Sequence, residues 1–68
     1  MSGKETFMIE TMTRDLVARL MEERSLTMRK AMDIVYSSRT YEALQNLNKG
    51  LYFQSPAYVF DELSKEIG

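Results

Sequence analysis

The sequence contains no cysteine, no histidine and no tryptophan. The lack of cysteine excludes a disulfide framework and removes any reason to expect an oxidising compartment, so a cytoplasmic location is expected. Histidine and cysteine are also the commonest ligands of zinc and related metals. No apolar run approaches the length of a bilayer-spanning segment. We therefore expect no metal, no cofactor, no signal peptide and no membrane partner.

The sequence also lacks an excess of either charge, because it has nine basic and ten acidic residues and a formal net charge of −1. Such a balance gives no general attraction to nucleic acid or to anionic lipid. The 68 residues are enough for one small domain, with residues 1–4 expected to fray. A chain of this length buries only about 60% of the surface that its unfolded form exposes. Without disulfides or metals, oligomerisation is the natural supplement to the core, and a homodimer is favoured.

The apolar spacing predicts an all-α fold, a compact unit of three or four helices. A long first helix is expected over 5–24, a second after the N-cap Thr27, a third after the N-cap Ser38, and a last helix from Pro56 after the N-cap Ser55. At the N-terminus, Ser2 and Glu5 have capping-box spacing. The expected inward side chains are Met8, Ile9, Met12, Leu16, Val17, Leu20 and Met21; Met28, Ala31, Met32 and Val35; Tyr41, Leu44 and Leu47; and Val59, Phe60, Leu63 and Ile67.

A short extended connector is predicted between Gly50 and the last helix, because the residues after Gly50 alternate loosely. In an extended segment alternate side chains face opposite ways. Leu51 and Phe53 are therefore expected to be buried, and Tyr52 to stay partly exposed.

Nothing in the sequence groups residues for catalysis. The acidic pairs Asp61–Glu62 and Glu22–Glu23 diverge by about 100° around a helix, so neither forms an acid/base dyad. The three glycines stand alone, which excludes a glycine-rich phosphate loop. An enzyme is not expected.

DNA binding is an alternative function, because residues 26–51 resemble part of a winged helix-turn-helix in which Arg39, Thr40 and Tyr41 would face a groove. The model requires a β-hairpin wing after Gly50, where the sequence predicts a helix instead. It also supplies few cations for phosphate contacts. No specific nucleic acid is therefore expected.

Two surface sites remain candidates. Tyr41, Tyr52 and Tyr58 form a candidate partner surface, since tyrosine offers contact area with a polar tip. Arg24, Arg29 and Lys30 cluster at the turn between the first two helices, and the last two lie in the first turn of the second helix, where the helix dipole disfavours cations. They form a candidate patch for an anion or an acidic partner, with Glu22 and Glu23 as the simpler counter-charges. The methionines at inward positions are read as core, although they could also line an adaptable binding surface.

One pattern resembles a known family. It places Ala31, Val35, Tyr36, Ser38 and Tyr41 before Gly50, Leu51, Tyr52, Ser55 and Tyr58. This arrangement is similar to that of a group of small, uncharacterised bacterial proteins, some of which are thought to be encoded beside putative toxins. The resemblance covers about half of the chain and implies a partner-binding or regulatory role. It supplies no catalytic residue. The leading expectation is a protein–protein interaction module, with the winged-helix regulator second and an enzyme a distant third.

Overall fold

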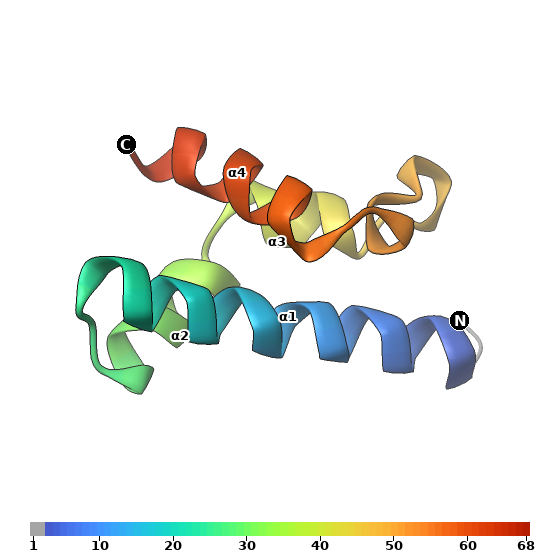
Figure 1. Cartoon of the computed structure of the whole chain (residues 1–68). Helices are drawn as coiled ribbons and strands as arrows, with labels where there is room; N and C mark the ends of the chain where they lie inside the picture. The colour runs from blue at the N-terminus through green and yellow to red at the C-terminus, as the bar shows by residue number, and fades with distance from the viewer. Residues whose placement is uncertain (1–2) are drawn as a thin grey trace.

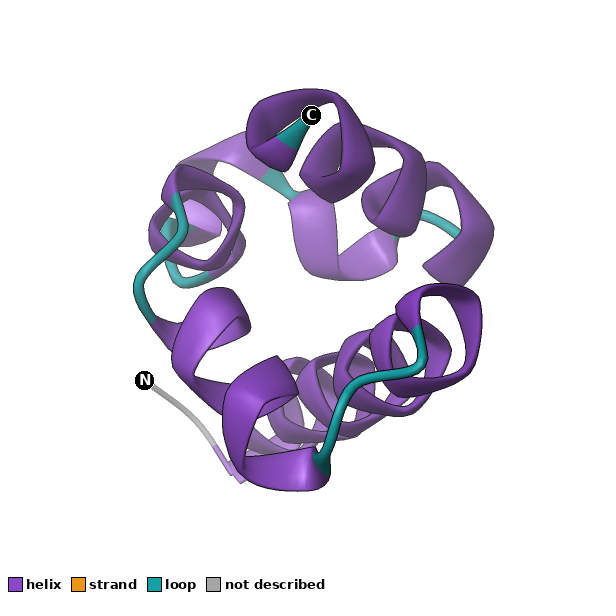
Figure 2. Cartoon of the chain, turned by 90° about the vertical axis from the view of Figure 1, so that its left-hand side faces the viewer, coloured by secondary structure: helices purple, strands orange, loops and turns teal. Residues whose placement is uncertain are grey.

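Helices make up most of residues 3–68, the part of the chain that this computed structural model describes (Figure 2). In chain order they are α1 (Gly3–Arg24), α2 (Met28–Tyr36), α3 (Arg39–Leu44), the 3-10 helices η1 (Leu47–Lys49) and η2 (Leu51–Phe53), and α4 (Pro56–Ile67). No strand occurs within the described range. The predicted all-α class is confirmed.

The helices lie in two layers, with α1 and α2 in one and α3, the 3-10 turns and α4 in the other (Figure 1). The core fills the space between the layers. Its fully buried side chains come from every α-helix: Leu16, Leu20, Val35, Leu44, Val59 and Leu63. The helices α1 and α4 run in the same direction, and Arg24 Nη2 donates a 2.8 Å hydrogen bond to the Gly68 carbonyl at their shared end.

The three predicted N-caps are confirmed. Thr27 Oγ1 accepts from the Lys30 amide at 3.2 Å, Ser38 Oγ from the Tyr41 amide at 3.0 Å, and Ser55 Oγ from the Tyr58 amide at 3.2 Å. Each bond satisfies a backbone donor that the first helical turn leaves free. Three local signals thus fix where three of the four α-helices begin.

The first helix begins earlier than predicted and ends at Arg24 as predicted. The helix includes Gly3 and Lys4, while Ser2 of the expected capping box lies outside the described residues. At the other end, Ser25 has a left-handed backbone with φ of 54°, and the Leu26 amide donates to the Met21 carbonyl at 3.1 Å. This is a Schellman-type ending with serine at the position that usually holds glycine.

The connector before α4 differs from the predicted extended segment. Leu51–Phe53 form a 3-10 turn that starts from Gly50 at φ of 63°, and only Gln54 and Ser55 are extended. As a result the predicted burial of Tyr52 and Phe53 is reversed. Tyr52 is only 8% exposed, whereas Phe53 is 67% exposed and Leu51 is half-buried. A 3-10 helix rotates by about 120° per residue, so the two-residue alternation assumed for this segment does not apply.

The exposure of the methionines of α2 also differs from the prediction. Ala31 and Val35 are fully buried as predicted, but Met28 and Met32 are exposed.

In the third predicted helix, α3 ends at Leu44, and Leu47 belongs to η1. Leu44 is buried, while Tyr41 and Leu47 pack against the core from half-buried positions. In α4, Val59 and Leu63 are buried and Phe60 and Ile67 half-buried, in agreement with the prediction.

Candidate interaction surface

An apolar groove runs along the outer side of the first layer, between α1 and α2. We call it the α1–α2 groove; it is lined by Thr13, Arg14, Val17, Ala18, Met21, Met28, Met32 and Tyr36 and has a volume of about 440 Å³. Six of these eight residues are apolar or aromatic. The groove is an open depression on the surface of the molecule.

The exposed wall of the groove comes from α2. Met28, Met32 and Tyr36 follow one another at intervals of four residues, so their side chains lie on one face of the helix. Their exposed fractions are 59%, 38% and 50%. The adjacent face, with Ala31 and Val35, already fills the contact with α1. This four-residue spacing is visible in the sequence, but periodicity alone predicts that its methionines belong to the core.

Tyr36 is held at one end of the groove by Tyr41. The two ring centroids lie 4.9 Å apart with planes at 78°, an edge-to-face arrangement. The Tyr41 hydroxyl accepts a 3.3 Å hydrogen bond from Gln45 Nε2. Burial raises the pKa of Tyr41, and Tyr36 and Glu10 raise it further. Tyr41 therefore remains neutral and acts as a packed support for Tyr36.

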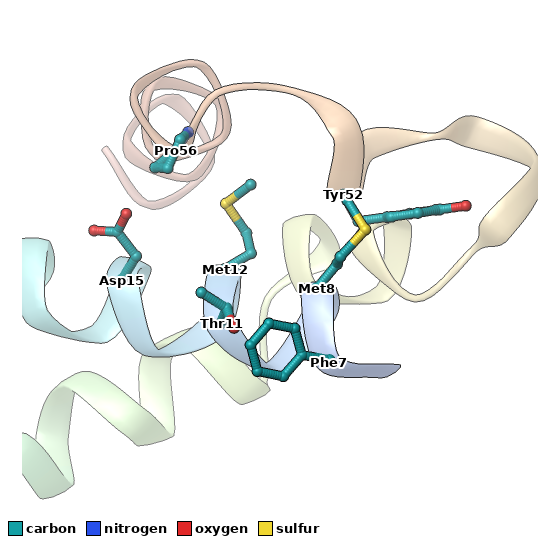
Figure 3. Close-up of a pocket in the computed structure, with 7 residues that line it drawn as sticks. All are labelled: Phe7, Met8, Thr11, Met12, Asp15, Tyr52 and Pro56. Atoms are coloured by element: carbon teal, nitrogen blue, oxygen red, sulfur yellow. The ribbon is translucent and has the colours of Figure 1, made fainter. Parts of the chain in front are cut away.

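A smaller pocket of about 200 Å³ lies beside the N-terminal half of α1. It is lined by Phe7, Met8, Thr11, Met12, Asp15, Tyr52 and Pro56. Figure 3 shows Met8 and Met12 reaching from α1 toward the segment that carries Tyr52 and Pro56. Because Met12 and Tyr52 are buried, most of this pocket is a shallow opening over the core.

The predicted tyrosine surface does not form as expected. Tyr52 is buried, and its ring lies 4.4 Å from that of Phe53. Tyr41 is half-buried and pairs with Tyr36, while Tyr58 is 52% exposed on α4. The expectation of an exposed Tyr52 was wrong, because that ring covers the core edge.

The predicted basic patch is exposed at Arg24, Arg29 and Lys30. The Arg24 guanidinium donates to the main-chain oxygen of Gly68 and not to the side-chain carboxylate of Glu22 or Glu23. Within residues 3–68 the ion pairs join Arg19 to Asp15 at 2.8 Å and Lys65 to Asp61 and Glu62 at 3.1 and 3.9 Å. The simpler counter-charges, Glu22 and Glu23, are therefore not paired with the patch. Its role as an anion site stays a prediction.

The residues of the winged-helix alternative take up different roles. Glu66 of α4 accepts hydrogen bonds from the Arg39 amide at 2.6 Å, from the Thr40 amide at 2.9 Å and from the Thr40 hydroxyl at 2.8 Å. Burial raises the pKa of Glu66, but these bonds and the Arg39 charge outweigh it and leave the pKa below its ordinary value. Thr40 is buried against α4 and does not face outward. The segment after Gly50 is helical, where a wing would require a hairpin.

The described residues offer no metal centre, because no three potential acidic, histidine or cysteine ligands cluster among residues 3–68. Over the same range, no helix combines the length and the apolar character that crossing a bilayer requires. The α1–α2 groove, at about 440 Å³, is larger than the pocket beside Tyr52 and Pro56, at about 200 Å³.

Comparison with family models, with characterised proteins and with solved structures finds no match to this chain. The resemblance to a small bacterial family therefore stays a prediction.

Proposed function

We propose that this chain is a small protein–protein interaction module that self-associates as a dimer through the α1–α2 groove. The observation that carries the proposal is the row of Met28, Met32 and Tyr36, which leaves three large apolar side chains exposed on one face of α2. Covering apolar surface is favourable at about 25 cal/mol per Å². Large exposed apolar patches on small proteins are typical of interaction sites.

The composition of the groove also supports a role as a protein–protein interface. Aromatic residues, methionine and arginine are enriched in protein interfaces relative to other surfaces, and the groove contains Tyr36, three methionines and Arg14. Methionine also adapts its shape to a partner because its side chain is unbranched and flexible. Tyr36, braced by Tyr41, adds a fixed ring that can act as an anchor.

The small size of the domain gives a dimer a further advantage. Within the described residues, the largest fully buried side chains are four leucines and two valines, so the core is small. A single core in a chain of this length rarely supplies more than about 3–5 kcal/mol. A partner that covers the groove adds buried apolar area without any change in the fold.

Sedimentation equilibrium tests the proposal. We expect a reversible dimer as the concentration rises from about 1 to 500 µM. The variant Met28→Ser should weaken the dimer about tenfold, which corresponds to ~1.4 kcal/mol of lost apolar contact. Because Met28 is 59% exposed, the same variant should leave the monomer's unfolding free energy nearly unchanged.

Phe53→Ser is the matched control. Phe53 is 67% exposed but lies outside the groove, so its loss should not affect association. A chain that stays monomeric over the whole concentration range would refute self-association. A dimer that is weakened by Phe53→Ser and not by Met28→Ser would place the contact surface elsewhere.

A further inference from the structure

The outward strip of α1 beside the groove carries two charges of opposite sign around a small residue. Arg14, Ala18 and Glu22 follow one another at four-residue intervals, and all three are exposed. Arg14 and Ala18 also line the groove. Neither Arg14 nor Glu22 takes part in the ion pairs found within residues 3–68. The strip therefore presents a plus and a minus charge that the monomer does not neutralise.

We infer that the groove receives a second copy of this chain, with the two α1 helices antiparallel and crossing at Ala18. This inference rests on the proposed self-association and specifies its geometry. Arg14 and Glu22 each lie about 6 Å along the helix from Ala18, at 1.5 Å per residue. A two-fold axis beside Ala18 and perpendicular to the helices brings Arg14 of each copy level with Glu22 of the other. Two Arg14–Glu22 pairs of opposite charge, one on each side of the axis, then face each other across the interface.

A parallel arrangement of the two helices fails the same test. It places Arg14 beside Arg14 of the other copy, and Glu22 beside Glu22, so that like charges meet at both positions. Opposite charges across an interface select the register and the partner, and like charges suppress the wrong arrangement. The charge order along this strip therefore selects the antiparallel pairing.

The side chains at and around the crossing point also suit this geometry. Helix axes pack about 8–10 Å apart, and the distance depends on the side chains at the contact. Alanine at position 18 permits a close approach. Beside the crossing, Met21, Met28 and Met32 of each copy are placed to cover the other copy's strip. An isologous contact of this kind closes after two subunits, which predicts a dimer and no larger assembly.

Charge reversal tests the pairing. Arg14→Glu and Glu22→Arg should each weaken the dimer about tenfold or more, because each places like charges together twice. The double variant Arg14→Glu/Glu22→Arg should recover most of the wild-type affinity. An equimolar mixture of the two single variants should form a heterodimer, since every facing pair is then of opposite sign. These residues are exposed, and circular dichroism and melting that match those of wild type, measured at a concentration where wild type is monomeric, would show that the monomers still fold.

Cysteine crosslinking tests the axis independently, because the natural sequence has no cysteine. Under mild oxidation, Ala18→Cys should give a covalent dimer, since the two positions meet at the axis. Thr11→Cys is the control, because Thr11 is exposed and lies seven residues, about two helical turns, before Ala18 on nearly the same side of α1. In the antiparallel pair its two copies lie about 21 Å apart along the helix, too far for a disulfide. In a parallel pair both variants would crosslink.

The outcomes separate the geometry from the proposed function. A wild-type dimer that is indifferent to the charge reversals, or that crosslinks through Thr11→Cys, overturns the antiparallel pairing and leaves self-association intact. A wild-type chain that remains monomeric, including one whose groove binds an amphipathic helix of another protein instead, overturns both.

Discussion

Glu66 and Thr40 are joined by two hydrogen bonds to one oxygen atom: Glu66 Oε1 accepts from the Thr40 amide at 2.9 Å and from the Thr40 hydroxyl at 2.8 Å. The other carboxylate oxygen accepts from the Arg39 amide at 2.6 Å. A side chain from the last turn of α4 thus closes the N-terminus of α3. It adds to the cap that Ser38 provides locally.

Replacing this carboxylate should destabilise the fold. We expect Glu66→Gln to lower the unfolding free energy by about 1 kcal/mol, because the amide carries no charge and has only one acceptor oxygen. Urea titration monitored by circular dichroism measures the change. Glu62→Gln is the matched control on the same helix: its carboxylate lies 3.9 Å from Lys65 in an exposed pair, so its loss should matter little. If both variants lowered the unfolding free energy equally, Glu66 would stabilise the fold only through its negative charge on α4 and not through its hydrogen bonds to α3.

The same contact predicts an acid-dependent loss of stability. The pKa of Glu66 in the folded chain lies below its ordinary value near 4.5. Its stabilising contribution is therefore fully present above that value and is lost as the pH falls through the lower, folded-state pKa. We expect the difference in unfolding free energy between wild type and Glu66→Gln to shrink between about pH 5 and pH 3. A difference that is constant across this range would contradict the assignment.

Tyr52 and Phe53 should respond to truncation in opposite ways. Tyr52 is 8% exposed, and Tyr52→Ala should lower the unfolding free energy by about 3 kcal/mol or more, as for other buried aromatic residues. Phe53→Ala should lower it by less than about 1 kcal/mol, because Phe53 is 67% exposed and its contact with the Tyr52 ring contributes little. Thermal unfolding of the two variants side by side distinguishes them. A larger loss of unfolding free energy for Phe53→Ala than for Tyr52→Ala would support the extended connector expected from the sequence.

A glycine at position 25 should stabilise the chain. Ser25 has φ of 54°, a conformation that favours glycine. We expect Ser25→Gly to raise the unfolding free energy by about 0.5–1 kcal/mol. Ser37→Gly is the control, since Ser37 follows α2 with φ of −92° and gains nothing from glycine there. Stabilisation by both substitutions would point to a cause other than the left-handed backbone.

Much of the fold follows from short-range patterns in the sequence. Thr27, Ser38 and Ser55 each mark a helix start, because an N-cap acts within three residues of itself. The inward side chains of α1 and α4 follow from a period of 3.6 residues sustained over several turns. In both cases the information lies within one element.

The errors arise where the deciding contact lies outside the element. Three residues such as Leu51–Phe53 are too few to distinguish a 3-10 turn from an extended segment, and the two predict opposite faces for Tyr52. On α2, Ala31 with Val35 and Met28 with Met32 form two adjacent apolar rows. Periodicity shows that both rows are apolar, but only the position of α1 decides which is covered. The candidate groove was missed for that reason.

The Glu66 contact also has a consequence for the order in which the chain folds. It joins residues 26 positions apart, whereas α1 and α2 are separated only by residues 25–27. Contacts between distant residues require more of the chain to be ordered first, so we expect the α1–α2 hairpin to form in the folding transition state and the Glu66 contact after it. Interactions made after the transition state act on the rate of unfolding. Stopped-flow kinetics of Glu66→Gln should therefore show a shorter lifetime of the folded chain and a nearly unchanged folding rate.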